Sequence, residues 1–430
     1  MDHDVIVVGA GMAGLSVASE LRALGLDVLV LEARDKIGGR VDTNYEFTSH
    51  PIERGAEFVH GENVVTWELI RRFGLHSLAA LEDDNNFFID VAGQSLPITQ
   101  AAKLPGGDSL KFMSTRPGVY DLARAWVKSR KPDTDLSSML KANGVVLDPE
   151  FYPIVSHSFE GLDAAGLQQL GVYGLVETSY AGDGDADFRI AEGYSSLSDH
   201  LARQLRIRLA EPVDRVTWNS AGARVATASG ATLEARKIVI TVPLAQLQQN
   251  AIRFEPPLTP DKQNAINRLG AGHIVKIVLQ FEDPFWPAHM ECFATDKRTG
   301  FWWRPGWNRS NEAPVLTAYA GATLADRLVK FGNDAAVQIA LEDLSQLFGN
   351  QAKTNYTSGM VLNWQREPYI EMAYSFCPVG TAGLRRVLSY PIDGVLFFAG
   401  EATSVERNAT VHGAVESGRR AAKEVSAAVC

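Results

Sequence analysis

The sequence contains very little cysteine: three residues among 430, at Cys292, Cys377 and Cys430. They lie far apart and form no CxxC pair, which argues against a disulfide framework and against a cysteine-built metal site. Such sparse cysteine is typical of a reducing compartment. We therefore expect a cytoplasmic protein with no metal ion in its chemistry.

Positive charge is scarce as well. The chain has 41 Lys and Arg residues against 51 Asp and Glu residues, which gives a net charge of −10 and a pI of about 5.5. This balance argues against a nucleic-acid partner, because binding phosphates needs a basic surface. An acidic protein can attract small cationic molecules, although many cytosolic proteins are equally acidic.

Long apolar runs are missing too. No stretch approaches the roughly 18 residues that a membrane-spanning helix needs, so we expect no membrane association. The chain opens with MDHD and enters a strand at once, which leaves no room for a signal peptide. What remains is an ordinary globular composition, 46% hydrophobic, and a length that predicts two or three domains or two interleaved lobes.

The first 32 residues carry the most informative motif. An apolar strand over residues 4–8 leads into Gly9, Gly11 and Gly14, spaced G-x-G-x-x-G, and a helix and a second strand follow, ending at Glu32. In this context the glycines allow a tight turn, a close approach to a pyrophosphate, and helix–strand packing, in that order. The helix N-terminus attracts phosphates and Glu32 can bind a ribose. The motif predicts a Rossmann-type dinucleotide site and leaves NAD and FAD open; a flavodoxin-like unit with accidental glycines is the alternative.

Three later segments favour FAD. Gly38, Gly39 and Arg40 closely follow the ribose-binding acid, and the small residues of 54–61 can lie against a flat ring. Near the C-terminus, a buried strand, the loop Gly400-Glu401 and a helix from about Thr410 provide a second helix N-terminus. Such a terminus stabilises the negative charge that forms on a reduced isoalloxazine. An unremarkable strand–helix unit is the alternative reading of this last segment.

Lys276 lies within the strand predicted over residues 274–281. Strand side chains alternate between faces, so Lys276 shares a face with Ile274 and Val278, while Val275 and Ile277 point to the core. Lysine is almost never fully buried. Alternation alone therefore favours a solvated lysine on a wet face.

Taken together, the motifs resemble those of the flavin-containing amine oxidases, the family of monoamine oxidases, polyamine oxidases and lysine-specific histone demethylases. The resemblance covers nearly the whole chain, and polyamine oxidases are the most similar branch. It is carried, in order, by GAGMAG, LEARDKIGGR, RGAEFVHG, EPVDRV, VITVPLAQL, IVKIVLQFEDPFW, WQREPYIEMAYS and FFAGEATSVERNATVHGAVESGRRAA.

The resemblance implies an α/β fold: a Rossmann-type FAD-binding domain, with the GxGxxG motif, into which an α+β substrate-binding domain is inserted. We expect the FAD-binding domain in three segments, 1–85, 186–255 and 375–430. Residues 86–185 are expected to form a helical insert, and residues 256–374 the main substrate-binding segment.

The same resemblance implies a set of FAD contacts. The glycine-rich turn would hold the pyrophosphate, Glu32 the ribose, and Val213 the adenine through its backbone. Glu401 would contact the ribityl chain and Val411 the pyrimidine edge. The full set of expected cofactor-binding residues is Gly9, Gly11, Ala13, Gly14, Glu32, Arg34, Gly39, Arg40, Gly55, Ala56, Glu57, Val213, Trp364, Gly400, Glu401, Thr410 and Val411.

For catalysis the resemblance changes the interpretation of Lys276. In the family, the lysine at this position reaches the flavin and holds a water near N5, and a lysine in a water-poor pocket has a lowered pKa and can relay a proton. Tyr374 matches one position of an aromatic cage around the amine. Thr410 stands where the second cage tyrosine usually lies, which implies a roomier site. Ala373 replaces the cysteine that attaches FAD in monoamine oxidases, so we expect non-covalent FAD.

Two polar residues complete the expected site. His60 matches a histidine placed beside the distal amine of a polyamine, and Glu160 an acidic residue at the pocket mouth. Trp302 and Trp303 could line the pocket or pack the sheet, and the sequence does not decide. The acidic stretch near residues 183–187 is interpreted as a solvated loop that could attract a polycation.

The implied activity is oxidation of an amine, most simply of spermine or spermidine. A hydride would pass from the α-carbon to flavin N5, oxygen would reoxidise the flavin to give H2O2, and the imine would hydrolyse to an aldehyde and a shorter amine. Alternatives are a monoamine oxidase, an L-amino-acid oxidase, which needs an arginine for the carboxylate, and a desaturase or protoporphyrinogen-type oxidase. A demethylase-like binding scaffold would need extra helical arms for which the chain has no space. The sequence does not indicate the oligomeric state.

Overall fold

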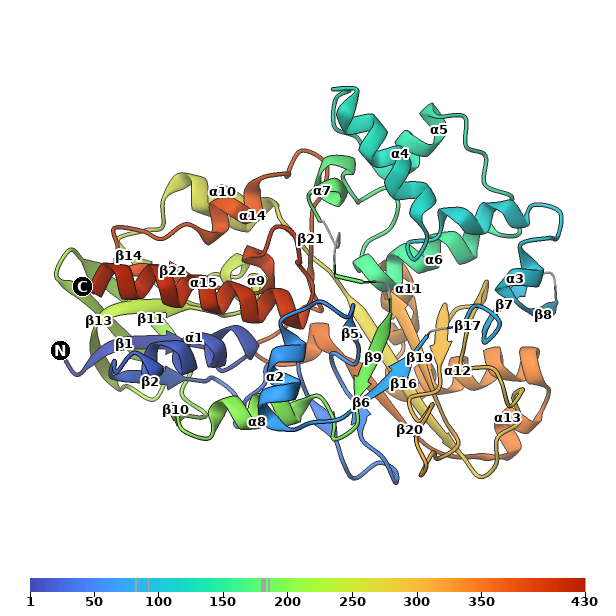
Figure 1. Ribbon diagram of the computed structural model, residues 1–430, viewed down its shortest axis with the longest axis horizontal. Helices are drawn as coiled ribbons and strands as arrows, with labels where there is room; N and C mark the ends of the chain where they lie inside the picture. The colour runs from blue at the N-terminus through green and yellow to red at the C-terminus, as the bar shows by residue number, and fades with distance from the viewer. Residues whose placement is uncertain (82, 92, 179–182, 185, 430) are drawn as a thin grey trace.

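The computed structural model describes residues 1–430 except 82, 92, 179–182, 185 and 430. The molecule is elongated, with one large sheet towards each end and a layer of helices above the second sheet (Figure 1). Both chain termini lie at the end that holds the first sheet. Cys430 and Asp185 fall outside the described residues.

The first sheet has eight strands in the order β10-β2-β1-β13-β12-β11-β14, with β22 also pairing with β13. The strands around β1 are parallel: β1 pairs with β2 and β13, β2 pairs with β10, and β13 pairs with β22. Its strands are β1 (His3–Val8), β2 (Val28–Leu31), β10 (Arg206–Arg208), β11 (Val213–Asn219), β12 (Gly222–Thr227), β13 (Thr232–Ile240), β14 (Arg253–Glu255) and β22 (Leu396–Phe398).

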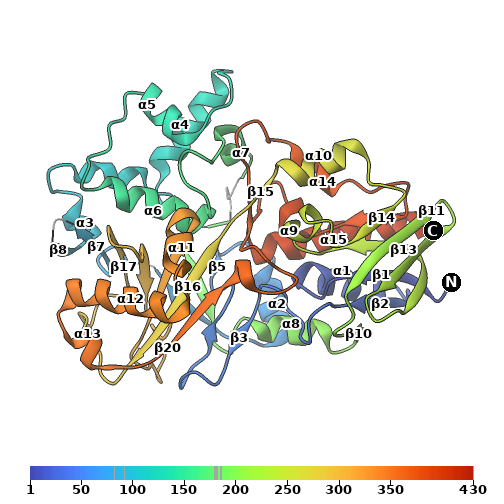
Figure 2. The ribbon, with the colours of Figure 1, turned by 180° about the vertical axis from the view of Figure 1, so that it is seen from behind.

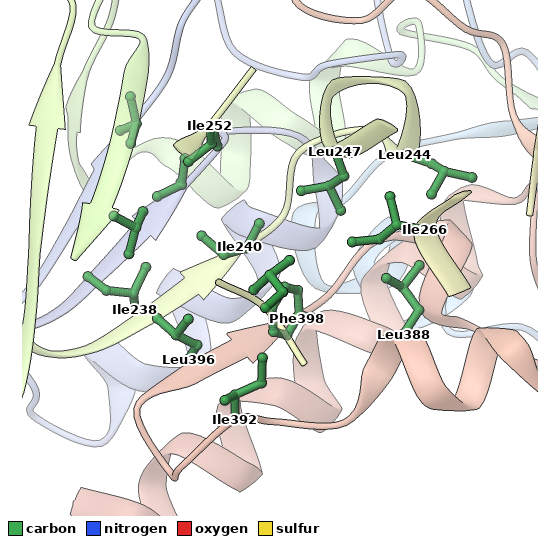
Figure 3. Close-up of a cluster of buried hydrophobic side chains, with 14 of the residues drawn as sticks. Ile238, Ile240, Leu244, Leu247, Ile252, Ile266, Leu388, Ile392, Leu396 and Phe398 are labelled. Carbon is green, nitrogen blue, oxygen red and sulfur yellow. The ribbon is translucent and has the colours of Figure 1, made fainter. Parts of the chain in front are cut away.

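Helices cover both faces of this sheet. Because β1 alternates, Val5 and Val7 point to one face and Ile6 and Val8 to the other, and all four are buried. The first face packs against α1 (Met12–Ala23), α2 (Thr66–Phe73), α8 (Ser195–Ala202) and α15 (Val411–Val429). The opposite face packs against α9 (Leu244–Gln248), α10 (Pro260–Arg268) and α14 (Leu384–Ser389), as the cluster in Figure 3 shows. Helices α1 and α15 lie side by side, so the two ends of the chain form one layer (Figure 1).

The second sheet has seven strands in the order β20-β16-β19-β18-β17-β7-β8. Figure 2 shows its long strands β16 and β20 running together along the near side of the molecule. Its strands are β7 (Phe87–Val91), β8 (Gln94–Pro97), β16 (Ile274–Phe281), β17 (Cys292–Thr295), β18 (Phe301–Trp303), β19 (Val315–Gly321) and β20 (Tyr356–Asn363). One face packs against α11 (Ala322–Val329), α12 (Asn333–Phe348) and α13 (Gln351–Thr354).

A helical layer lies over the other part of the second sheet (Figure 1). It consists of α3 (Ile98–Ala101), the 3-10 helix η1 (Gly107–Phe112), α4 (Pro117–Lys128), α5 (Leu136–Ala142), α6 (Tyr152–Asp163) and α7 (Val172–Glu177). This is the segment expected as a helical insert, but its first residues form β7 and β8 and extend the second sheet.

Three small sheets connect these parts. They pair β3 (Thr43–Asn44) with β4 (Ile52–Glu53), β15 (Gly270–Ala271) with β21 (Ser375–Phe376), and β9 (Asp187–Ile190) with both β5 (Val59–His60) and β6 (Ser77–Ala80). Two short 3-10 helices, η2 (Trp364–Arg366) and η3 (Glu401–Thr403), complete the structure. None of the described helices is long and apolar enough to cross a bilayer.

Both faces of β16 are buried, although alternation alone favours a solvated face around Lys276. Residues Ile274, Lys276 and Val278 are 2%, 3% and 0% exposed. Ile52, at the start of β4, packs with Val278 on this face, because the loop that follows the first sheet's opening unit folds over the strand. A period-two pattern identified the strand and its two faces, but it could not indicate that both are covered.

Candidate active site

One large cavity, with a volume of about 1630 Å³, runs between the two sheets. This exceeds the roughly 300–1,000 Å³ of an ordinary ligand pocket and leaves room for a dinucleotide and a second molecule. At one end, the glycine-rich end, it is lined by Gly9, Gly11, Ala13, Glu32 and Val213. At the other end, which we call the distal arm, it is lined by Met113, Ser114, Tyr120, Ile154, Leu162 and Asp163.

The glycine-rich turn has the geometry that a pyrophosphate needs. Gly9 has φ +107°, and a Cβ there would lie 2.7 Å from the Thr241 hydroxyl, so the turn requires glycine. At Gly11 a Cβ would meet only Gly39, at 3.9 Å, and would project into the cavity. Gly14 does not line the cavity; a Cβ there would lie 2.0 Å from the Gly9 carbonyl oxygen, so Gly14 allows α1 to pack on the turn.

The N-terminus of α1 is open to a ligand. Gly11 occupies its N-cap position and no side chain caps the helix, so backbone N–H groups and the positive end of the dipole are available to a phosphate. Glu32 accepts hydrogen bonds from the N–H groups of Ala10 (2.6 Å) and Arg34 (2.9 Å). Burial raises the pKa of Glu32 and these hydrogen bonds oppose the rise. The residues present therefore fit FAD at this end.

Two arginines, Arg34 and Arg40, also line the cavity. Arg34 donates to the Gly39 carbonyl (3.1 Å) and pairs with Glu367 (2.5 Å). Arg40 donates to the Ala373 carbonyl and pairs with Glu401 (3.0 Å). These contacts fix both guanidinium groups against the cavity rather than leaving them in solvent.

Glu401 is buried at the start of η3 and is fully engaged. Besides Arg40, its carboxylate accepts from the Ser375 hydroxyl (2.6 Å) and the Ala409 N–H (3.0 Å). Burial would raise the pKa of Glu401, but Arg40 and Arg385 outweigh it and hold the pKa below its usual value. The other expected cofactor contacts that line the same cavity are Gly55, Ala56, Glu57, Trp364, Gly400, Thr410 and Val411.

Lys276 is the buried cation of the second sheet. Its ammonium donates to the carbonyl oxygens of Glu53 (3.1 Å) and Gly55 (2.8 Å) and to a carboxylate oxygen of Glu57 (3.1 Å). An ammonium has three N–H donors, and all three are used by these protein acceptors. The indole of Trp303 lies 5.2 Å from the nitrogen. The nitrogen of Lys276 is therefore fully hydrogen-bonded at the cavity wall, and its partner Glu57 was not expected in that role.

Glu57 is the centre of a buried charge network. It accepts from Arg189 (2.9 Å) and from the indole N–H of Trp303 (2.7 Å), in addition to Lys276. Burial would raise the pKa of Glu57, but the cations Lys276 and Arg189 outweigh this and hold it below its usual value. Glu57 thus carries the negative charge that balances Lys276.

Three aromatic side chains from the second half of the chain face the cavity beyond Lys276. Tyr374 donates to the carbonyl of Gly161 in α6 and lies 3.1 Å from the Tyr319 hydroxyl. Tyr319 is paired directly opposite Lys276 across β16 and β19, and burial raises its pKa to about 12. Trp303 lies with its ring centroid 5.2 Å from that of Tyr319.

The structure separates the two neighbouring tryptophans whose roles the sequence left open. Trp302 is 0% exposed and stacks on Phe293 in the core, whereas Trp303 lines the cavity. Alternation along β18 explains the difference, since successive side chains point to opposite faces.

Thr410 and Glu160, two of the candidate catalytic residues, both have side chains that are hydrogen-bonded at helix N-termini. The Thr410 hydroxyl donates to the Arg407 carbonyl and accepts from the Gly413 N–H (2.9 Å), which caps the first turn of α15. The Glu160 carboxylate accepts from the Leu324 N–H (3.2 Å) in the first turn of α11 and is not part of the cavity wall. Both side chains satisfy helix N-termini, a role that a loose motif match does not reveal.

His60 does line the cavity, and it has a partner. Its Nδ1 lies 2.6 Å from the Asp187 carboxylate. Burial alone would lower the pKa of His60, but the negative charge of Asp187 outweighs it and raises the pKa. Asp183, expected in a solvated loop, is instead 2% exposed and pairs with Arg407 (2.5 Å).

The contacts of three residues at this site were not predicted from the sequence: those of Tyr319, Arg189 and Asp187. Tyr319 lies on the same face of β19 as Val315 and Thr317, so alternation could have indicated its strand face but not its pairing with Lys276. Arg189 and Asp187 lie on the four-residue strand β9. No local pattern indicates that this strand inserts between β5 and β6 beside the cavity.

Comparisons with known proteins agree with this architecture. A family model described as "Flavin containing amine oxidoreductase" matches residues 12–426. The chain is 31% identical over 437 residues to polyamine oxidase 3 of Oryza sativa subsp. japonica, covering 97% of this chain and 88% of that protein. It is 29% identical over 453 residues to lysine-specific histone demethylase 2 of Homo sapiens, covering 99% of this chain but only 54% of the demethylase.

Solved structures show the same fold at lower identity. A putrescine oxidase bound to putrescine superposes with a TM-score of 0.84 at 20% identity, covering 99% of both chains. Cyclohexylamine oxidase from Brevibacterium oxydans IH-35A gives a TM-score of 0.82 at 23% identity, again over 99% of this chain. Together with the family match, these findings confirm the expected α/β fold with its Rossmann-type FAD-binding region. The chain belongs to the flavin-containing amine oxidoreductase family, and it is an FAD-dependent oxidoreductase that acts on amines.

Proposed function

We propose that the protein is a polyamine oxidase that acts on spermine- or spermidine-type amines with molecular oxygen as the acceptor. One observation carries this proposal: a single cavity joins the glycine-rich end to the distal arm, with Lys276 and three aromatic side chains along it. A long cavity of this kind suits an extended amine. The identity to a rice polyamine oxidase supports the same substrate class.

The domain division of this proposal follows the two sheets. Segments 1–85, 186–255 and 375–430 would form the FAD-binding domain, and they supply the strands of the eight-stranded sheet. Segments 86–185 and 256–374 would form the substrate-binding part, and they supply the seven-stranded sheet and the helical layer. We place the protein in the cytoplasm, as the sparse cysteine suggests.

The chain's own residues would hold the cofactor along the wall already described. The turn at Gly9 and Gly11 and the N-terminus of α1 would take the pyrophosphate, Glu32 the ribose, and the N-terminus of α15 at Val411 the pyrimidine edge. Bound FAD would supply the two-electron acceptor for the amine, and oxygen would then restore it with release of H2O2.

The residues beyond the cofactor would prepare the amine. Tyr374, Tyr319 and Trp303 exclude water and orient the substrate. Desolvation among these side chains favours the neutral form of the reacting amine, and the lone pair of that form is needed to release a hydride. Lys276 would act as a held positive charge, not as a free base.

We propose that FAD is bound without a covalent link. Ala373, and not a cysteine, stands beside Tyr374 on the cavity wall. Acid precipitation of the purified protein should release all of its yellow colour into the supernatant. Flavin that stays with the pellet would contradict this part of the proposal and would direct attention to Cys292, which also lines the cavity.

The test of the function is peroxide release from a panel of spermine, spermidine, monoamines and L-amino acids, with product identification. We expect turnover of the polyamines above that of the other classes. The arginines that line the distal arm, Arg116 and Arg124, are paired with Asp84 (2.5 Å) and Asp121 (2.7 Å), so we expect poor turnover of amino acids. A flavin-loaded protein that oxidises none of these amines would favour a demethylase-like binding role instead.

A further inference from the structure

A short turn after η2 forms part of the cavity wall. In this turn, residues 367–371, the Glu367 carbonyl accepts hydrogen bonds from the N–H groups of Ile370 (3.1 Å) and Glu371 (3.1 Å). Tyr369 and Ile370 line the same cavity as the glycine-rich turn. We call residues 367–371 the strap. The FAD contacts expected from the sequence include no residue of this segment.

Both ends of the strap are attached to residues of the glycine-rich end. Glu367 pairs with Arg34 (2.5 Å), whose backbone N–H donates to the expected ribose-binding acid Glu32 (2.9 Å). Glu371 accepts a hydrogen bond from the side-chain amide of Gln246 (2.8 Å) in α9. Because Arg34 and Gln246 both line the cavity, the strap runs along the cavity wall from one to the other.

The strap holds two residues in an unfavourable backbone conformation. Tyr369 has φ 64° and Glu371 has φ 54°, values that residues other than glycine seldom adopt. Such conformations cost free energy and persist where the surrounding contacts impose them, often at sites that clamp a ligand. Glycine would adopt this conformation without that cost. The conformation alone therefore does not account for a tyrosine at position 369.

The protein leaves much of the Tyr369 side chain uncovered. Tyr369 is 44% exposed although it is part of the cavity wall, whereas the next residue, Ile370, is 2% exposed. Aromatic side chains bury large areas when they pack on a neighbouring molecule. FAD bound along the glycine-rich end would give this ring a surface to cover, and the strap would then exclude water from the cofactor.

We propose that Tyr369 is an FAD-binding residue, and that the strap, held by the ion pair between Arg34 and Glu367, retains the cofactor by covering the glycine-rich end. This inference rests on the proposed non-covalent binding of FAD, and it does not depend on which amine is oxidised. The strap lies between β20 and β21 in the chain. The segment that leaves the second sheet would therefore close the cofactor side of the cavity.

The experiment measures how fast flavin leaves the diluted holoenzyme, through the fluorescence of free FAD. We expect Tyr369→Gly and Tyr369→Ala to release FAD roughly tenfold faster than the wild type, as on losing one aromatic contact with a bound molecule. Tyr369→Phe keeps the ring and should release FAD at the wild-type rate. Wild-type release from Tyr369→Gly would overturn the proposal. Faster release from the glycine variant alone would assign the effect to backbone freedom and would also overturn it.

A matched variant controls for the backbone conformation. Asp393 is exposed, has φ 50°, and is not part of the cavity wall. Asp393→Gly therefore makes the same kind of backbone change at a distance from the cofactor site and should release FAD at the wild-type rate. Faster release from this variant, equal to that from Tyr369→Gly, would overturn the assignment of Tyr369.

The ion pair is tested in the same assay. Glu367→Gln removes the charge that pairs with Arg34 and should speed FAD release, though by less than Tyr369→Gly. Glu342→Gln removes the charge of another ion pair, with Arg298 (3.0 Å), away from the cavity wall, and should not change the rate. An unchanged rate in Glu367→Gln would overturn the role of the ion pair.

Acid precipitation of the same samples separates the two proposals. Flavin that acid releases, but that leaves the wild type and Tyr369→Gly at equal rates, would overturn only the strap. Flavin that acid does not release would overturn both the strap and the non-covalent binding on which it rests. Since no amine is needed, a failure of the polyamine proposal would leave these results unaffected.

Discussion

Among the residues that the structure describes, two lysines are buried, and they lie in different surroundings. Lys276, in the second sheet, is 3% exposed, lines the cavity, and has a carboxylate among its three acceptors. Lys262, in α10 beside the first sheet, is 2% exposed and donates to the carbonyls of Leu388 (2.8 Å) and Tyr390. Its nitrogen lies 3.8 Å from the centroid of the Phe398 ring.

The difference between them lies in the partners and not in the burial. Burial and the nearby Arg420 lower the pKa of Lys262 to about 7, and its contacts join α10 to the end of α14 within a packed core. Lys276 is balanced by Glu57 and faces open space. A buried lysine alone is therefore no sign of catalysis; a carboxylate partner and an adjoining cavity distinguish the two.

The largest effect should come from removing that carboxylate. Glu57→Gln leaves Lys276 and Arg189 buried without their shared anion, and breaking a buried pair typically costs about 3–5 kcal/mol. Denaturant unfolding with the flavin bound measures the loss. The double variant Glu57→Gln, Lys276→Met should lose less than the sum of the single variants; an additive result would show that the two charges do not interact.

The next effect concerns turnover. Lys276→Met should bind FAD as the wild type does but oxidise amines roughly 100-fold more slowly, since it removes a preorganised charge. Lys262→Met is the matched control and should leave kcat unchanged. Equal rates in the wild type and Lys276→Met would show that this lysine has no role in turnover. Lys276 and Lys262 would then differ only in their structural surroundings.

The third prediction uses pH. The pKa of Lys262 is lowered from 10.5 to about 7 on folding, so between these values the unfolded chain binds more protons and stability rises with pH. Relative to Lys262→Met, the wild type should gain on the order of 2 kcal/mol in unfolding free energy between pH 7 and pH 9. Taking the difference between the two proteins cancels other groups, such as Glu53, whose pKa burial raises to about 7. A difference that is flat with pH would mean that Lys262 keeps its proton throughout.

The smallest expected effect concerns Thr410, another polar residue whose hydrogen bonds within the protein can account for its presence. If its hydroxyl serves mainly as a helix cap, Thr410→Ala should cost about 1 kcal/mol of stability, and Thr410→Ser should restore it. Thermal unfolding of the flavin-loaded variants measures this. A full loss of turnover in the alanine variant with unchanged stability would instead indicate a catalytic role for the Thr410 hydroxyl.

Local sequence patterns predicted the strand, turn, helix and strand at the start of the chain, because this unit is one continuous segment. The turn at Gly9 and Gly11, the helix that follows, and the acid Glu32 belong to one continuous unit, so spacing alone places them. The strand of Lys276 and its two faces were also predictable from alternation.

The rest of the site depends on contacts between distant segments. Glu57 meets Lys276 across 219 positions of the chain, and Tyr374 meets Gly161 across 213. No period or spacing encodes such pairs, and this is why the contacts of Glu57 and Tyr319 with Lys276 were not predicted from the sequence. Lys262 was equally unpredictable, since the polar helix segment PDKQNAINR reads as exposed.

The central claim is that both halves of the molecule act on one cavity, with FAD along the first sheet and an amine against the second. Anaerobic addition of spermidine to the purified protein, followed by the visible flavin absorbance, tests it most directly. We expect a yellow protein whose absorbance bleaches on mixing and returns with air, and a Lys276→Met variant that is equally yellow but bleaches far more slowly. A colourless protein, or a yellow one that no polyamine bleaches, would contradict the account.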